Sequence, residues 1–284
     1  PDILTHGMKQ YLEVKKAHPD CLVMLRMGDF YEMFYADAVT AARELEITLT
    51  SRGKGDKKAP LAGVPFHALE PYLGKLVKKG YKVAIVEQLE DPKKAKGLVK
   101  RGLVRIVTPG TIIESSMLNE KENNYIMALT SLGEELAVAF CDMSTGEFFT
   151  AKVPGVNTLR NEIARLAPSE CIVPESLLVN TELINQIKNN NCYVNTIEDY
   201  YFRSEKATET LLQHFNLHNL EAFGLENQKL NMSVSGALLH YLMTTQKNTL
   251  THIKKISFRS SQDTMILDSG TLRNLELTKN IRDG

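Results

Sequence analysis

The sequence predicts an α/β protein with two domains, followed by the start of a helical segment. Short apolar, aromatic or β-branched runs alternate with stretches whose apolar residues recur at helical spacing, which is typical of strands alternating with helices. The length of 284 residues corresponds to about two domains, since domains usually contain roughly 100–200 residues. A polar stretch without periodicity covers residues 111–122 and indicates a linker.

The first domain, residues 1–110, is predicted to mix helices and strands. Apolar spacing predicts three helices, over 5–17, 38–46 and 68–79, the second of them capped by Asp37. Composition predicts six strands, over 21–27, 30–35, 47–50, 61–66, 83–87 and 104–108. The segment 51–59 carries four cations and two glycines, so we expect an exposed basic loop there.

The second domain, residues 123–258, opens with three predicted strands separated by turn residues, which indicates an antiparallel meander. These strands cover 125–130, 136–142 and 147–152. Helices over 157–166, 181–189 and 204–216 then alternate with strands over 170–173 and 192–197. A meander followed by this alternation predicts a mixed sheet like that of ribonuclease H. A long helix over 231–247 follows, and leucines in 269–280 indicate another.

The net charge hides an asymmetry between the two halves. The whole chain has 34 Lys and Arg against 34 Asp and Glu, and a neutral total argues against nucleic-acid binding. Residues 1–110, however, contain 19 basic and 13 acidic residues, a net charge of +6. Residues 111–284 contain 15 and 21, a net charge of −6. Opposite charges indicate separate domains with separate partners.

Composition and cysteine usage predict a folded protein of the cytoplasm. Hydrophobic residues make up 43% and charged residues 24%, enough apolar side chains for a packed core. No run approaches the roughly 18 apolar residues of a membrane helix, and the first residues show no signal-peptide pattern. The cysteines are far apart and beside apolar residues, so we expect buried free thiols in a reducing compartment. They are Cys21, Cys141, Cys171 and Cys192.

The sequence contains none of the common catalytic motifs. Walker A, Gly-x-Gly-x-x-Gly, His-Glu-x-x-His and Gly-x-Ser-x-Gly are all absent from it. His214 and His218 have the i, i+4 spacing of a metal site on a helix, without an evident third ligand. An ordinary helix face explains the two histidines more simply. With no catalytic motif in the sequence, a non-catalytic protein-interaction module is one alternative function for the whole chain.

A ribonuclease-H-like nuclease is a second alternative, and it rests on Asp142. Such nucleases gather several carboxylates around Mg²⁺, and here Glu170 and either Glu198 or Asp199 would join Asp142. These nucleases carry the first aspartate on the first strand, whereas Asp142 ends the second predicted strand. A hairpin turn stabilised by Asp142 and Ser144 explains the same residues.

The predicted strand after Gly28-Asp29 has an unusual face. Alternate residues of a strand share a face, so Phe30, Glu32 and Phe34 project together. If Phe30 and Glu32 lie at the strand end, a large apolar ring and a carboxylate both reach a ligand. The spacing alone favours an ordinary half-buried strand with Phe30 in the core.

Basic residues surround this strand in the sequence. They lie in the loop 52–58 and in the run 75–105. Solvated helix faces are the usual meaning of such runs, but a domain of net charge +6 with a basic loop can also neutralise DNA phosphates.

Several strings together resemble the MutS family of DNA mismatch-repair proteins. The resemblance covers nearly the whole chain in family order and makes a chance match very improbable. The strings in the first half are 26–34 (RMGDFYEMF), 49–53 (LTSRG), 61–67 (LAGVPFH), 83–88 (VAIVEQ) and 105–111 (RIVTPGT). Those in the second half are 142–146 (DMSTG), 223–227 (FGLEN) and 272–276 (LRNLE).

The resemblance implies an architecture and a set of partners. Residues 1–110 would form a mismatch-recognition domain, 123–258 a ribonuclease-H-like connector without nuclease activity, and 259–284 the start of a helical core or lever domain. Clamp and ATPase domains would follow Gly284, so ATP, Mg²⁺ and dimer formation belong to the full-length family and this chain is no enzyme by itself. Mismatched or looped duplex DNA and the repair factor MutL, through the connector, are the implied partners.

The resemblance also assigns roles to individual residues. The family's Phe-x-Glu mismatch reader falls on Phe30 and Glu32. Arg52, Lys54 and Lys58, with Arg105, would contact the DNA backbone and position the protein without reading sequence.

Elementary physics supports these roles. A mismatch detector must work in any sequence, which suits the degenerate minor groove and the readout of DNA deformability. An apolar wedge, here Phe30, turns weakened stacking into a kink at an unstacking cost of about a few kcal/mol. Near phosphates the proton affinity of Glu32 should rise, so that a protonated Glu32 donates a hydrogen bond to a base and an ionised one is repelled by paired DNA.

Overall fold

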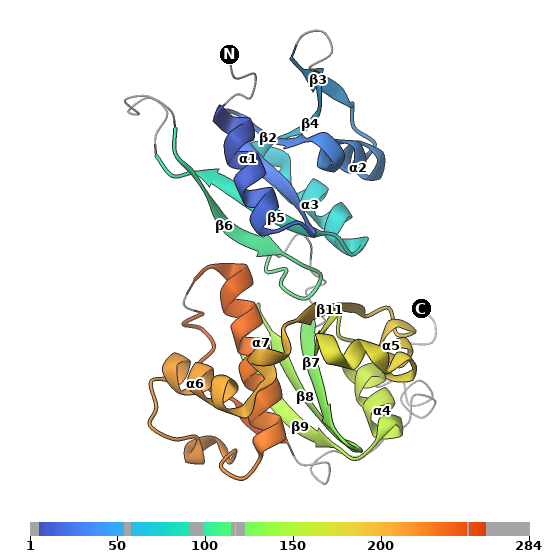
Figure 1. Ribbon diagram of the computed structural model, residues 1–284, viewed down its shortest axis with the longest axis vertical. Coiled ribbons are helices and arrows are strands. Elements are labelled where there is room, and N and C mark those ends of the chain that lie inside the picture. The colour runs from blue at the N-terminus through green and yellow to red at the C-terminus, as the bar shows by residue number, and fades with distance from the viewer. Residues whose placement is uncertain are drawn as a thin grey trace. The chain divides into compact units, whose positions relative to one another are not determined.

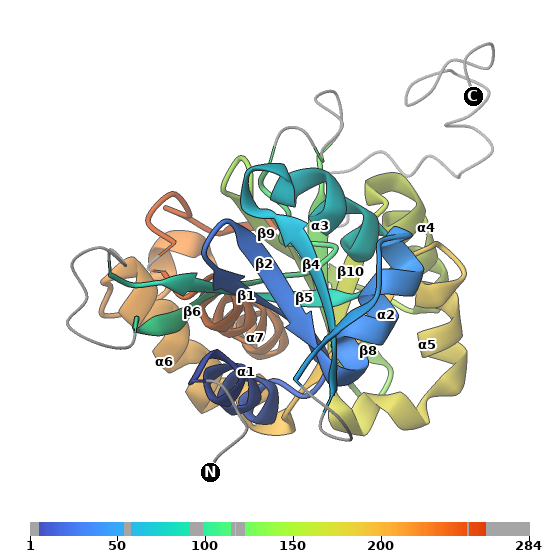
Figure 2. The same ribbon diagram turned by 90° about the horizontal axis from the view of Figure 1, so that it is seen from above.

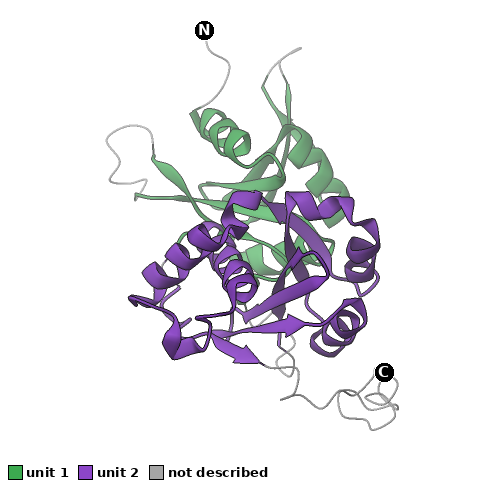
Figure 3. Ribbon diagram, turned by 60° about the horizontal axis from the view of Figure 1, so that its bottom comes forward, with its two compact units in different colours: residues 1–122, 245–247 green, residues 123–244, 248–284 purple. Residues whose placement is uncertain are grey.

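A computed structural model describes residues 6–53, 58–90, 99–114, 117, 123–248 and 250–259. The chain divides into two compact units (Figure 3). Unit 1 comprises Pro1–Glu122 with Thr245–Lys247, and unit 2 comprises Asn123–Thr244 with Asn248–Gly284. The predicted linker 111–122 is described only at 111–114 and 117, and the predicted helical start at 259–284 lies, apart from residue 259, outside the described residues. Both predictions remain untested.

Unit 1 contains a six-stranded sheet in the order β3-β4-β2-β1-β5-β6 (Figure 1). Its strands are β1 Cys21–Met27, β2 Phe30–Phe34, β3 Thr50–Arg52, β4 Ala59–Pro65, β5 Lys82–Gln88 and β6 Arg101–Val107. Strands β1 and β5 are parallel and the other neighbours are antiparallel. The helices are α1 His6–Ala17, α2 Tyr35–Leu45 and α3 Leu69–Lys78, with the short 3-10 helix Phe66–Ala68 before α3.

The two faces of this sheet bury different helices (Figure 2). One face packs Tyr31 and Met33 of β2 into a cluster with apolar residues of α2 and α3, such as Ala41 and Leu76. The other face packs Phe34 with Tyr11 of α1. Alternation along β2 therefore splits the core into two layers, as period-two side-chain geometry requires. The predicted mixed α/β fold of this half is confirmed.

Two local predictions for unit 1 are wrong. Asp37 does not cap α2, whose N-terminal flanking residue is Phe34; it is buried in the first turn instead. There its carboxylate accepts hydrogen bonds from Tyr11 Oη at 2.6 Å, Lys15 Nζ at 2.8 Å and the Val23 amide at 3.0 Å. The strand predicted over 47–50 begins only at Thr50, so Arg52 belongs to β3 and not to a loop. Edge strands need a partner, and only the pairing with β4 sets where β3 begins.

Unit 2 contains a second six-stranded sheet, in the order β11-β10-β7-β8-β9-β12. Its strands are β7 Tyr125–Leu132, β8 Glu135–Asp142, β9 Glu147–Val153, β10 Glu170–Pro174, β11 Tyr193–Ile197 and β12 Ser257–Arg259. The first three form the predicted antiparallel meander, while β10 and β11 run parallel to β7. This is the mixed sheet expected of a ribonuclease-H-like fold. Strand β12, three residues that pair with β9, was not predicted from the sequence.

Helices cover both faces of the second sheet (Figure 1). They are α4 Val156–Leu166, α5 Thr181–Lys188, α6 Ser204–Phe215 and α7 Lys229–Gln246. Residues of α4 and α5, such as Ile163 and Ile187, form one apolar cluster with the sheet, and residues of α6 and α7, such as Leu211 and Leu238, form another. Short 3-10 helices lie at Glu175–Val179, Asp199–Phe202 and Glu221–Phe223.

All four cysteines are free and buried, as predicted. Burial raises the pKa of the Cys21 thiol to about 12, so this thiol stays protonated and unreactive. Among the described residues, no helix is long and apolar enough to cross a membrane.

Candidate nucleic-acid interface

The most exposed aromatic side chain of unit 1's sheet lies where β2 begins. Met27 pairs with Phe30 across a two-residue turn, in which Gly28 has a φ of 60° that favours glycine. The tight hairpin leaves the Phe30 side chain at the end of the sheet, 48% exposed. The interpretation of Phe30 as a core residue is therefore wrong, because burying this ring would require sheet or helix beyond the strand end.

Phe30, Glu32 and Phe34 share one face of β2, as the alternation predicted. Glu32 is paired with Gly63 of β4, and a Cβ atom at Gly63 would lie 3.8 Å from Phe30 Cδ1 and 3.9 Å from Glu32 Cγ. The ring and the carboxylate thus gather over a glycine, whose lack of a side chain leaves that space open. The same face carries Phe34 into the core below.

Glu32 is held by an arginine from the edge of the sheet. Arg52 Nη1 donates to Glu32 Oε2 at 2.8 Å and Arg52 Nη2 donates to Glu32 Oε1 at 3.3 Å, a two-pronged ion pair. Burial raises the pKa of Glu32, and Arg52 and Arg101 oppose that rise without cancelling it. Glu32 therefore binds a proton more readily than an ordinary glutamate before any phosphate approaches.

A second exposed ring follows the β4 residue that pairs with Phe30. Phe66 follows Pro65, the β4 partner of Phe30, and it is 41% exposed. The Arg26 guanidinium lies 3.6 Å from the centre of the Phe66 ring, and the Phe66 amide donates to Asp29 O at 2.9 Å. Sequence reasoning missed Phe66 and Arg26 as site residues, although both lie in strings that carried the family resemblance.

The predicted DNA-backbone residues have unequal surroundings. Arg52 is engaged by Glu32, and Arg105 is engaged by Glu114, with its pKa lowered because it is buried. Both guanidiniums are therefore ion-paired in the structure, and their contact with phosphates remains a prediction. Lys58 is exposed just before β4, and Lys54 lies outside the described residues. Their contact with phosphates remains a prediction.

The carboxylates of the nuclease alternative do not converge. Asp142 pairs with Tyr125 and Glu170 with Ile126, and these neighbouring β7 residues face opposite sides of the sheet. Asp199 follows β11, whose end lies four residues, or about 13 Å, along the strand from the level of Glu170. The described residues contain no group of three or more metal-binding side chains.

Internal hydrogen bonds engage an oxygen of Asp142 and an oxygen of Glu170. Asp142 Oδ1 accepts from the Ser144 amide at 2.8 Å and the Ser144 hydroxyl at 2.7 Å, which is the predicted turn. Glu170 Oε1 accepts from Tyr241 Oη at 2.6 Å and Asn195 Nδ2 at 2.8 Å.

The histidine pair does not form either. Helix α6 ends at Phe215, and Asn216 adopts a left-handed conformation, so His218 lies beyond the helix. His214 Nε2 is instead within 2.9 Å of the Ile253 carbonyl oxygen. The predicted i, i+4 geometry is therefore absent from this segment.

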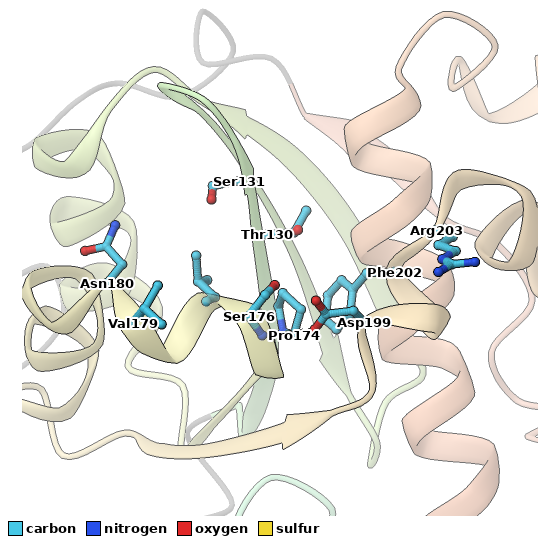
Figure 4. Close-up of a pocket in the computed structure, with 10 residues that line it drawn as sticks. Thr130, Ser131, Pro174, Ser176, Val179, Asn180, Asp199, Phe202 and Arg203 are labelled. Carbon is cyan, nitrogen blue, oxygen red and sulfur yellow. Dashed lines mark hydrogen bonds between the residues drawn. The ribbon is translucent and has the colours of Figure 1, made fainter.

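Unit 2 has a pocket of about 410 Å³ at the carboxyl ends of β7 and β10 (Figure 4). Thr130 and Ser131 line it from β7, Pro174 from β10, and Asp199 and Arg203 from the segment after β11. The chain leaves β7 toward β8 and leaves β10 toward β11, so the pocket occupies a point where the strand order reverses. Nothing in the sequence marked this pocket.

Comparison with known families decides where the chain belongs. Residues 5–116 match the family model of MutS domain I, and residues 124–254 match that of MutS domain II. The chain belongs to the MutS family. Phe30, Glu32 and the ion pair with Arg52 all lie within MutS domain I, and the pocket lies within MutS domain II.

Relatives named as DNA mismatch repair protein MutS extend the match. The chain is 48% identical to that of Methanococcoides burtonii over 98% of its length, covering 32% of the relative. It is 45% identical to that of Symbiobacterium thermophilum over 100% of its length, covering 33%. The chain thus spans about a third of the length of the MutS relatives it matches.

Proposed function

We propose that unit 1 recognises mispaired or looped duplex DNA by inserting Phe30 from the minor groove, with Glu32 contacting a displaced base. The observation that carries this proposal is the placement of Phe30, half-exposed at a strand end, with a carboxylate over the same glycine. A wedge needs a ring that projects from a rigid support, and the β1–β2 hairpin inside a six-stranded sheet supplies one.

The charge distribution supports the assignment to unit 1. Residues 1–110 have a net charge of +6, which favours a phosphate surface, whereas residues 111–284 have −6. The relatives carry the name DNA mismatch repair protein. In this view the wedge tests how easily a base step unstacks, so recognition depends on deformability and not on sequence.

The test introduces Phe30→Ala into the full-length protein. Fluorescence anisotropy should show that preference for a mismatched over a matched duplex is lost, while weak binding to both remains. Leu132→Ala, which removes a 72% exposed apolar side chain from unit 2, is the matched control and should keep the preference. Preference retained after loss of the Phe30 ring excludes the wedge.

The remaining proposals concern the longer protein. We infer that unit 2 acts as a connector that contacts MutL, and that ATP, Mg²⁺ and dimer formation belong to parts outside this chain, which itself carries out no catalysis. We also infer that it works in the cytoplasm, which the four buried free thiols support. Copurification of MutL with unit 2 surface variants and ATPase assays of the longer protein test the first two.

A further inference from the structure

The ion pair between Glu32 and Arg52 joins the proposed base contact to a short edge strand of the sheet. Strand β3 is three residues long and lies at the sheet edge, paired only with β4 among the described residues. The Arg52 side chain is 35% exposed, whereas that of Glu32 is 14% exposed. The carboxylate is therefore sheltered and its partner stands on the solvent side.

The other charged group near Glu32 is fixed differently. Arg101 of β6 acts on Glu32 through space, while its own donors go to neutral acceptors. These are Arg26 O at 2.7 Å, Gln10 Oε1 at 2.9 Å and Val99 O at 3.2 Å. Strands β1 and β4 place the uncharged Leu25 and Gly63 opposite Glu32. Among the described residues, Arg52 is thus the cation that binds Glu32 directly.

A DNA phosphate competes for Arg52 on equal geometric terms. Guanidinium groups bind carboxylates and phosphates through the same pair of parallel hydrogen bonds. An Arg on a sheltered ion pair at the edge of a basic domain has the solvent exposure to change partner. A carboxylate that loses its counter-ion while staying buried then favours its protonated form.

We propose that Arg52 is a transferable counter-ion, bound to Glu32 in the free protein and handed to a DNA phosphate only when a mismatch lets Phe30 insert. This proposal rests on the proposed function of unit 1. At a well-paired duplex the base step resists kinking, Phe30 stays outside and Arg52 remains on Glu32. At a mismatch Arg52 binds phosphate, and Glu32 takes one proton from solvent and donates it in a hydrogen bond to a base acceptor. Arg52 therefore determines specificity, whereas an ordinary phosphate contact serves both duplexes alike.

Proton uptake gives the transfer a sign that can be measured. If mismatch binding takes up a proton at Glu32, mismatch affinity falls as pH rises above the pKa of Glu32 in the free protein. Matched-duplex affinity should not show this dependence, because Glu32 keeps its partner and its charge there. The Glu32→Gln variant should abolish the dependence, since it has no proton to gain.

The first test follows Glu32 in the chain without DNA. Carboxyl ¹³C NMR, with the Glu32 signal assigned by its absence in Glu32→Gln, should show the Glu32 titration moving upward in Arg52→Gln. Lys58→Gln removes an exposed cation that forms no ion pair with a described residue, and should leave the titration in place. An unmoved Glu32 titration in Arg52→Gln overturns the proposal.

The second test measures how tightly the full-length protein binds one matched and one mismatched duplex at several pH values. Arg52→Gln should reduce affinity for the mismatched duplex severalfold more than affinity for the matched duplex. Arg52→Lys keeps the charge but loses the planar guanidinium with its paired donors, so its loss of mismatch affinity should lie between those of the unaltered protein and Arg52→Gln. Lys58→Gln should weaken both duplexes alike. In a Glu32→Gln background, Arg52→Gln should lose its selectivity and behave like Lys58→Gln.

The outcomes separate this inference from the function beneath it. Equal weakening of both duplexes by Arg52→Gln, while the unaltered protein still prefers mismatches, overturns the counter-ion transfer and leaves the proposed function standing. A protein without mismatch preference, even if Arg52→Gln moves the Glu32 titration, overturns both.

Discussion

Units 1 and 2 both contain sheltered carboxylates, and they use them in opposite ways. Glu32 in unit 1 binds a side chain that is partly in solvent, close to an exposed ring. Glu170 in unit 2 is fully buried and binds Tyr241 and Asn195, and Asp142 closes a turn. The two carboxylates differ in the exposure of their partners. Arg52 lies on an edge strand and is 35% exposed, whereas Tyr241 is buried.

The largest expected effect is a loss of stability when the buried hydrogen bonds of Glu170 in unit 2 are removed. Glu170→Ala should lower the free energy of unfolding by about 2–4 kcal/mol, because it leaves Tyr241 Oη and Asn195 Nδ2 without this acceptor and opens a cavity. Denaturant unfolding of the chain measures the change. Glu135→Ala is the control: its ion pair with Lys152 is surface-exposed, so a loss below about 1 kcal/mol is expected. Equal losses for the two variants contradict the structural role of Glu170.

A smaller effect on stability, with a clear effect on binding, is expected for Glu32→Ala. Its partner is partly exposed, so the loss of stability should stay below about 1 kcal/mol. Affinity for matched DNA should rise severalfold, because the variant removes a negative charge and frees Arg52 to bind phosphates. The ratio of mismatched to matched affinity should therefore fall. Anisotropy titrations with both duplexes measure it, and weaker matched binding would show that Glu32 does not repel paired DNA.

The smallest effect concerns Lys58, an exposed lysine beside the same sheet edge. Lys58→Ala should weaken both duplexes by a similar factor and reduce the slope of log affinity against log salt by about 0.9, the value for one phosphate contact. Binding measured at several salt concentrations tests this. A loss of affinity confined to mismatched DNA would show that Lys58 takes part in a mismatch-specific contact. Lys58 would then not differ from Arg52 in the way proposed.

The sequence predicted the layout of unit 2 well because local patterns carry it. The meander comes from three strands with turn residues between them, and the later strands each follow a helix, so few topologies remain possible. The exceptions are informative. Strand β12 has three residues and exists through its pairing with β9. The i, i+4 spacing of His214 and His218 gives no shared helix face, because α6 ends before His218.

The candidate site was predicted only in part. Period-two alternation gave the shared face of Phe30 and Glu32, since it depends on neighbours in the chain. The exposed position of Phe30 and the pairing of Glu32 with Arg52 depend on residues far apart in sequence, and no local rule selects one arginine among several.

By itself the sequence determined the class of each sheet, the faces of β2, the opposite charges of the two halves and the family. Each of these follows from neighbouring residues, from composition or from motifs in order. The tertiary structure decided which polar groups are internal and which lie at the surface. It buried Asp37 and Glu170 in hydrogen-bonded networks and placed Arg105 in an ion pair with Glu114. It also left Phe30 exposed at a strand end. The reason is physical: the partner and exposure of a charge depend on long-range packing, which brings together strands that the sequence keeps apart.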